Sequence, residues 1–346
     1  MNNDTWRLPA EWEPQSGVQL TWPHEDTDWY PYLNEATETF VELATAIARR
    51  EKLLIVAPNL TQVKPLLEQH IDPIYHANLR YAQCPSNDTW ARDHGPLTLL
   101  SATGSKLIDF RFNGWGEKFA WQKDNLVTRN LYAKRCFNGL IERQDNFVLE
   151  GGAIESDGKG TLLTTSQCLL APHRNQPMNK AELTQQLLQT LHAKRVLWLD
   201  YGHLIGDDTD GHIDTLVRMA PNDTLLYIKC TDKDDPQYQE LLLMEEQLAT
   251  LSNAEGKPYR LVSLPLPDAI MFEGERLPAT YANFVVLNGA VICPVYGQKN
   301  KDQEALQTLS EAFPTRKIIG IDARIIIRQH GSLHCLTMQY PQGVMI

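Results

Sequence analysis

Four short stretches of the sequence combine charged residues with glycine. They read W-A-R-D-H-G-P at 90–96, L-E-G-G at 149–152, G-H-I-D-T at 211–215 and G-S-L-H-C-L-T-M at 331–338. Together they supply a cysteine, histidines and carboxylates, the side chains that attack a carbon, transfer protons or hold a cation. Each stretch alone is weak support for chemistry, but the set favours an enzyme with a thiol nucleophile and a distant base.

Cys335 directly follows His334, which raises the question of whether the two form a thiolate and its base. The flanks, I-I-I-R at 325–328 and C-L-T-M-Q-Y at 335–340, are β-branched and aromatic and indicate strands. Successive side chains of a strand point to opposite faces, so we predict that the two side chains face apart. The base must then come from elsewhere; on its own, a cysteine in a strand is more often a packing residue.

His212 and Asp214 are the best candidates for that base and for an anionic binding group. A strand-like run, T-L-V-R-M, follows at 215–219, and residues two apart on a strand share a face. The pair could also be a solvent-facing pair at a strand end, or could ligate a metal. Because no H-x-x-x-H or paired-cysteine spacing supports a metal, we predict no metal site.

Asp93 and Glu150 contribute further carboxylates beside glycine, which lets a backbone or a ligand approach closely. Asp93 could instead be a salt-bridged loop residue with Arg92 as its neighbour. Glu150, before two glycines, could instead cap a helix or turn. The aromatic residues Trp90 and Trp115 could line a site for a cation or pack in the core.

Composition narrows the classes of protein. The chain has 346 residues, of which 42% are hydrophobic and 22% charged, enough for a sizeable core. It lacks an 18-residue apolar run and a leader-like start, so we expect no membrane span, no signal peptide and a cytoplasmic protein. The net charge of −11 argues against a nucleic-acid partner and is compatible with a small cationic substrate.

The six cysteines are scattered without a C-x-x-C pair, so we expect free thiols rather than a disulfide framework. Most of them sit in apolar runs, where a buried thiol that only packs is the simplest interpretation. The sequence allows a homo-oligomer and does not define its size.

Helical and strand patterns alternate along the whole chain, which predicts one α/β domain over residues 1–346. Amphipathic periodicity predicts helices near 34–51, 123–137, 179–194, 237–253 and 302–313. Strand-like runs follow them at 53–58, 147–150, 195–200, 261–266 and 317–322. Paired strands joined by turn residues are expected at 97–112 and 283–296.

These stretches resemble, in order, the motifs of the agmatine deiminase family, which belongs with the bacterial peptidylarginine deiminases in the guanidine-modifying superfamily. Further motifs extend the resemblance over nearly the whole chain: L-P-A-E-W-E-P at 8–14, L-T-W-P-H at 20–24, F-N-G-W-G-E-K at 112–118 and Y-A-N-F at 281–284. One departure is clear. The family's usual G-G-N-I-H-C is H-G-S-L-H-C here, with His330 and Ser332 in place of glycine and asparagine.

The resemblance implies a five-bladed α/β propeller of strand–strand–helix–strand units around a central channel. It implies an agmatine iminohydrolase that feeds putrescine synthesis without a metal or organic cofactor. Carried over by motif, the roles are Cys335 as nucleophile, His212 as acid and base, Asp93 and Asp214 as guanidinium clamps, and Glu150 as the carboxylate near the histidine. His334 is then a neighbour in sequence only, so its replacement by alanine is expected to keep substantial activity.

Three alternatives to agmatine hydrolysis stay open. A peptidylarginine or free-arginine deiminase would use the same chemistry with different access. A Cys-His amide hydrolase would need an oxyanion hole of hydrogen-bond donors, whereas acids accompany this cysteine. A polyamine-binding protein would not need Cys335.

Overall fold

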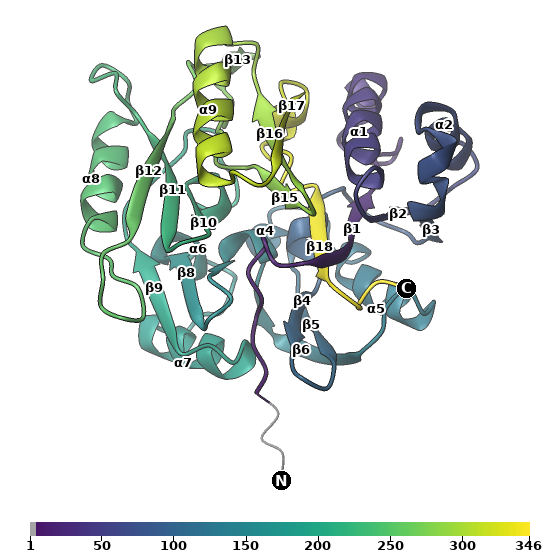
Figure 1. The fold of residues 1–346 in the computed structure, drawn as a ribbon, viewed down its shortest axis with the longest axis horizontal. Helices are drawn as coiled ribbons and strands as arrows, with labels where there is room; N and C mark the ends of the chain where they lie inside the picture. The colour runs from purple at the N-terminus through teal and green to yellow at the C-terminus, as the bar shows by residue number, and fades with distance from the viewer. Residues whose placement is uncertain (1–4) are drawn as a thin grey trace.

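The structure, a computed structural model, describes residues 5–346, and within them five sheets of three or four strands share one connectivity. In each sheet an antiparallel pair of strands is followed by a crossover helix and a strand parallel to the second (Figure 1). Four of these units are continuous in the sequence. The first consists of β4 (Leu97–Leu100), β5 (Ser105–Arg111), α5 (Val127–Ala133) and β6 (Leu140–Val148), and the second of β7 (Glu155–Ser156), β8 (Thr161–Thr165), α7 (Lys180–Thr190) and β9 (Arg195–Leu199). The third consists of β10 (Val217–Ala220), β11 (Thr224–Lys229), α8 (Tyr238–Leu248) and β12 (Arg260–Pro265), and the fourth of β15 (Val285–Leu287), β16 (Ala290–Val295), α9 (Lys299–Ala312) and β17 (Lys317–Asp322).

The fifth unit joins the two ends of the chain. The last strand, β18, pairs antiparallel with the first, β1, placing Val18 opposite Gln339. Its strands run in the order β18-β1-β2-β3, with helices α1 and α2 as crossovers. The bounds are β1 (Gln15–Thr21), α1 (Leu33–Ala48), β2 (Lys52–Ala57), α2 (Val63–His70), β3 (Leu79–Gln83) and β18 (Thr337–Pro341). Segments from opposite ends of the sequence therefore share one sheet.

Helix α1 shows why the periodic pattern was a good predictor. Its stripe of Phe40, Leu43, Ala44 and Ile47 is completely buried, as its helical spacing predicts. All five predicted helices are present, and four of the strands that follow them lie close to their predicted positions. The strand predicted at 147–150 is displaced, because β6 runs from Leu140 to Val148 and ends before Leu149. The observed units repeat the predicted strand–strand–helix–strand order. The fold is thus a single α/β domain, as predicted.

The remaining elements are short. A two-stranded hairpin, β13 (Met271–Phe272) with β14 (Glu275–Arg276), lies between β12 and β15 along the chain. Across residues 5–346 the structure has no helix that combines the length and the apolar character needed to cross a membrane.

The strands predicted around the His334–Cys335 pair are wrong in part. Residues 326–329 form a 3₁₀ helix, and residues 333–336 form a turn that ends where β18 begins at Thr337. Ile326 and Ile327 are both completely buried, so successive side chains do not alternate between a covered and an open face. A short apolar run cannot by itself distinguish a strand from a buried helical turn.

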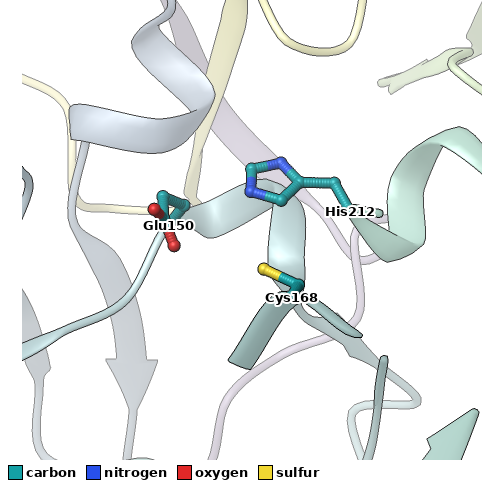
Figure 2. A group of neighbouring side chains, drawn as sticks. All are labelled: Glu150, Cys168 and His212. Carbon is teal, nitrogen blue, oxygen red and sulfur yellow. The ribbon is translucent and has the colours of Figure 1, made fainter. Parts of the chain in front are cut away.

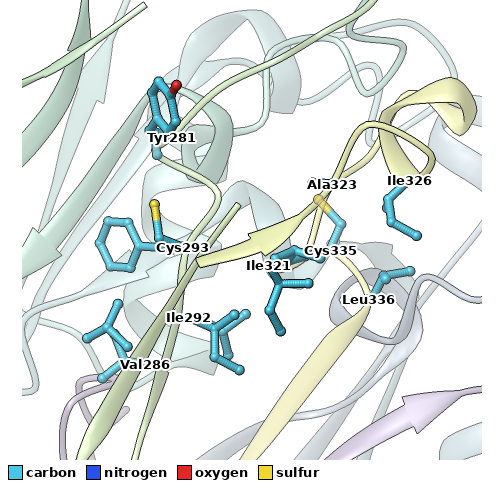
Figure 3. Packing of buried hydrophobic residues seen from close by; sticks show 14 of the residues in the cluster. Tyr281, Val286, Ile292, Cys293, Ile321, Ala323, Ile326, Cys335 and Leu336 are labelled. Carbon is cyan, nitrogen blue, oxygen red and sulfur yellow. The ribbon is translucent and has the colours of Figure 1, made fainter. Parts of the chain in front are cut away.

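The turn that carries Cys335 is packed into the core. Leu336 of the same turn and Ile326 lie beside Cys335 (Figure 3). Ile321, Ile292 and Val286 of the neighbouring sheet belong to the same apolar cluster. Close packing of this kind holds a short irregular segment in one conformation. Cys335 is therefore held on a rigid base although it lies outside regular secondary structure.

Candidate active site

A short turn precedes the first strand of each of the five units. Asp93, Asp214 and Cys335 lie in three of these turns, and Glu150 and His212 directly precede two of them. The turns are α3 (Ala91–His94), η4 (Gly151–Ala153), η5 (Ile213–Thr215), the loop 279–284 and the turn 333–336. Their backbones meet: the N–H of Arg92 donates to the carbonyl of Cys335 at 3.1 Å, and α3 contacts η4, which contacts η5. The shared connectivity thus brings five distant segments to one place.

Gly152 marks the centre of this meeting point. A β-carbon added there would lie 2.6 Å from Nδ1 of His212, 2.9 Å from Oδ1 of Asp93 and 3.1 Å from Oδ2 of Asp214. Any side chain would collide with these groups, so the position requires glycine for close approach. The three predicted polar residues therefore surround one backbone position.

Asp93 is held by two donors and faces a histidine. Trp115 donates its indole N–H to Oδ2 at 3.0 Å, and the N–H of Gly152 donates to Oδ1 at 3.0 Å. Nδ1 of His212 lies 3.6 Å from the same Oδ1. Burial raises the pKa of Asp93 to about 6, although the cationic form of His212 opposes this rise.

His212 is completely buried and neither ring nitrogen has a hydrogen-bond partner among the described residues. Burial by itself would lower its pKa, but Asp93, Cys168 and Glu150 outweigh burial and raise the pKa of His212 well above its usual value. The imidazole is thereby kept in its protonated form, which can donate a proton in a reaction.

Glu150 lies near His212 but does not hydrogen-bond to it within the described chain. Instead Oε1 accepts from Nε of Arg174 at 3.0 Å, and Arg174 also contacts Asp210 at 2.6 Å. The predicted carboxylate is therefore beside the imidazole, while its direct partner is a buried arginine. Its influence on the imidazole acts through charge.

Cys335 lies between acids and an amide. Its Sγ is 3.9 Å from Oδ2 of Asp214 and donates to Oδ1 of Asn283 at 3.4 Å. Burial, followed by the charges of Asp214 and Asp93, raises the pKa of the Cys335 thiol well above its usual value. In the free protein the sulfur is thus a thiol.

His334 does not act as partner to the adjacent sulfur, because its ring lies behind Asp214. Its Nδ1 is 2.7 Å from Oδ2 of Asp214, and its Nε2 is 2.8 Å from Oε2 of Glu11 and 3.0 Å from Nη2 of Arg218. The contact with His334 lowers the pKa of Asp214 against the effect of burial, which would raise it. His334 therefore supports a carboxylate of the site.

The pocket that reaches Cys335 is lined by acids and aromatic rings. Its described lining consists of Asp28, Asp88, Trp90, Asp93, Trp115, Phe119, Asp208, Thr209, Gln329, His330, Gly331 and Cys335. Both predicted tryptophans are in this wall. A β-carbon on Gly331 would lie 2.3 Å from the Trp90 ring, so glycine is needed there. Of the two positions that depart from the motif, His330 lines the pocket, whereas Ser332 is buried without being part of that lining.

Three residues of this region were missed as site residues. Asn283, which lies in the Y-A-N-F motif, also accepts the backbone N–H of His334 at 2.9 Å and so fixes the turn of the cysteine. Cys168 was interpreted as a packing thiol and Arg174 was not selected. Cys168 and Arg174 gave no local signal, because their contacts come from segments that are distant in sequence.

This fold is found in a distantly related protein of known structure. A dimethylarginine dimethylaminohydrolase from Pseudomonas aeruginosa matches with a TM-score of 0.51 at 12% identity, over 94% of this chain and 100% of that chain. At this identity the likeness concerns the fold alone. The chain therefore has the same single-domain α/β fold as that protein.

Comparisons at higher identity show the family of the chain. The model of the Porphyromonas-type peptidyl-arginine deiminase family matches residues 7–341, and the chain belongs to this family. A protein of Vibrio parahaemolyticus named "Putative agmatine deiminase" is 34% identical over 98% of this chain and 97% of its own length. The agmatine deiminase family predicted from the motifs is thereby confirmed.

Two solved structures are closely similar. The "Putative Arginine Deiminase" of Porphyromonas gingivalis has 48% identity and a TM-score of 0.93, over 99% of this chain and 100% of that one. A cysteine-to-serine variant of the C. jejuni agmatine deiminase with substrate bound has 36% identity and a TM-score of 0.91, over 99% and 98%. These relatives agree with the predicted enzyme class, a hydrolase of guanidino C–N bonds.

Proposed function

We propose that the protein is an agmatine deiminase, which hydrolyses the guanidinium of agmatine to N-carbamoylputrescine and ammonia as a step of putrescine biosynthesis. One observation carries the proposal: the only cysteine in the described pocket wall, Cys335, lies beside Asp214 and shares that wall with Asp93. A flat cation is the ligand that two buried carboxylates beside a sulfur would select.

The two aspartates would act as clamps. A guanidinium is planar and presents paired N–H donors that match carboxylates. Asp214 keeps Oδ1 without a partner, and Oδ1 and Oδ2 of Asp93 are each held by one donor, which leaves acceptor capacity for a substrate. Each charge-assisted contact contributes about 1.5–3 kcal/mol. A simple amine cannot fill both clamps.

Substrate binding would also prepare the nucleophile. The charges of Asp214 and Asp93 oppose a thiolate at Cys335 in the free protein. A bound guanidinium compensates both carboxylates, so the thiol can release its proton to solvent as the substrate enters. The thiolate then attacks the central guanidinium carbon, a C–S bond forms, and a tetrahedral adduct results.

His212 would serve twice. In its protonated form it gives a proton to the departing nitrogen, the C–N bond breaks, and ammonia leaves an amidino group on the sulfur. The now neutral imidazole takes a proton from a water molecule that attacks the same carbon. The C–S bond then breaks, and the ureido product leaves with the thiol side chain regenerated.

The pocket rim favours agmatine over arginine. Asp28, Asp88 and Asp208 line it, and the described lining contains no lysine or arginine. Burial raises the pKa of Asp88 to about 6 and, together with the nearby Asp207, that of Asp208 to about 6. The distal amine of agmatine would compensate these carboxylates, whereas the α-carboxylate of free arginine would be repelled.

We further propose that the five units close into a five-bladed propeller around the pocket. The pairing of β18 with β1 supports closure between the first and last units, and the contacts among the turns support a common axis. In this arrangement each blade delivers one turn to the centre. A peptidylarginine deiminase would need the same centre to be reachable by a polypeptide.

The test is ammonia release from agmatine, free arginine and a peptidyl-arginine, measured side by side with EDTA present. The proposal predicts the highest kcat/KM for agmatine and full activity in the presence of the chelator. A preference for peptidyl-arginine or free arginine would assign the alternative substrate. Cys335→Ala should abolish turnover, whereas a polyamine-binding protein would keep its function in that variant.

A further inference from the structure

A second thiol, that of Cys168, lies beside His212. The donor atoms of Cys168, Glu150 and His212 all lie within 4.8 Å of one another, and the three side chains are completely buried. Figure 2 shows the three side chains pointing toward one another from separate segments. The proposed reaction uses Cys335 as its nucleophile, so the thiol of Cys168 forms no bond to the substrate in it.

The chain holds Cys168 in this position by local contacts. It lies in α6 (Ser166–Leu169), where the hydroxyl of Thr165 accepts the N–H of Cys168 at 3.2 Å. The same hydroxyl donates to the carbonyl of Gly211 at 2.6 Å, directly before His212. A single threonine thus ties the segment of the thiol to the segment of the imidazole.

Polar atoms in this cluster lack partners. Oε2 of Glu150 and both ring nitrogens of His212 are buried without a hydrogen bond among the described residues. A buried polar atom without a partner destabilises the fold, because it has lost its hydrogen bonds to water. Because these atoms converge with a thiol, the cost would be recovered by a bound cation.

We propose that Cys168, Glu150 and His212 form an inhibitory binding site for Zn²⁺. Sulfur, imidazole nitrogen and carboxylate oxygen are the ligands that zinc takes in proteins, with bonds of about 2.0–2.3 Å. Donor atoms bound to one such ion lie closer together than 4.8 Å, so modest side-chain rotations would close the site. A water molecule would complete a tetrahedral arrangement.

Charge also favours one divalent ion. Glu150 is already compensated by Arg174 at 3.0 Å. On binding, the thiol of Cys168 becomes a thiolate, and its proton and any proton on the coordinating nitrogen of His212 are released to solvent. The thiolate together with the carboxylate of Asp93, which lies 3.6 Å from Nδ1 of His212, balances the two charges of the metal.

Inhibition rests on the proposed function of His212. An imidazole that holds a metal through one nitrogen cannot become an imidazolium, so it cannot deliver a proton to the departing ammonia. The activity should therefore fall as zinc is added and return with EDTA. Such a site would couple turnover to the free concentration of zinc.

Metal binding can be tested apart from activity with Co²⁺, which reports a thiolate ligand by a charge-transfer absorption band. The band should appear in the wild-type protein, persist in Cys335→Ser and in the control Cys136→Ser, and be absent from Cys168→Ser. A band that is lost in Cys335→Ser and kept in Cys168→Ser would place the metal on the nucleophile and overturn the proposal, as would the absence of any band.

Inhibition of agmatine hydrolysis by zinc provides a second test of the site. In zinc titrations of agmatine hydrolysis, Cys168→Ser should need at least about 10-fold more zinc for half inhibition than Cys136→Ser, each relative to its own metal-free rate. Equal sensitivity would overturn the proposal. If Cys168→Ser fails to fold, anomalous scattering from cobalt-soaked wild-type crystals locates the metal directly. If agmatine is not a substrate, the cobalt band still tests the site.

Discussion

Replacing His334 by alanine probes how the site supports one of its carboxylates. His334 provides the closest side-chain contact of Asp214, at 2.7 Å, and both residues are buried. A hydrogen bond to a charged group contributes about 1.5–3 kcal/mol, and each 1.4 kcal/mol is about tenfold in rate. The kcat/KM of His334→Ala should therefore fall about 10- to 150-fold, a larger loss than adjacency in sequence alone suggested.

The assay is steady-state ammonia release, with two comparison variants. His334→Asn keeps an N–H donor at the position of Nδ1 and should recover part of the loss. His212→Ala should lose at least about 10⁴-fold, because a general acid and base contributes about 10²–10⁴ and His212 would act in two steps. The reasoning is refuted if the two alanine variants lose activity equally, or if His334→Ala matches the wild type.

Three further outcomes are expected. Asp93→Asn should reduce kcat/KM for agmatine at least about 10-fold through loss of one charged clamp, and an unchanged value would remove Asp93 from binding. Alkylation of Cys335 by a neutral reagent in the free protein should slow steadily as pH falls through 9, because burial, Asp214 and Asp93 raise the pKa of the thiol. A midpoint of the alkylation rate near pH 5 would contradict thiolate formation that depends on bound substrate. Burial raises the pKa of Glu51 from 4.5 to about 7, so the folded state holds an extra proton between these pH values. The free energy of unfolding should therefore fall as pH rises through this window, by at most about 3.4 kcal/mol. Glu51→Gln should flatten this trend in thermal melts between pH 5 and 8, and an unchanged slope would argue against it.

Regular elements could be predicted because their signals are local. The stripe of α1 lies within one helix, and the apolar run of β17 at 317–322 coincides with the observed strand Lys317–Asp322. Asp93 and His212 could be selected because glycine and charge stand together in their stretches. Glycine is required at position 152 because any side chain there would collide with both His212 and Asp93.

The rest depends on contacts between units. Residues 325–328 have strand-like composition, yet packing makes 326–329 a helical turn. Asn283 is a site residue only because the fold brings it into contact with Cys335, which is 52 residues away in the sequence. Cys168 and Arg174 likewise acquire significance only next to His212 and Glu150. The spacing of residues in a single sequence does not predict contacts between such distant segments.

The proposed reaction requires the sulfur of Cys335 to attack the guanidinium carbon. Acid quenching of the protein during turnover of agmatine, followed by peptide mass spectrometry, tests it most directly. The peptide containing Cys335 is expected to gain the mass of agmatine less ammonia. An adduct on Cys168, or turnover without any adduct on Cys335 under conditions that accumulate the intermediate, would contradict it.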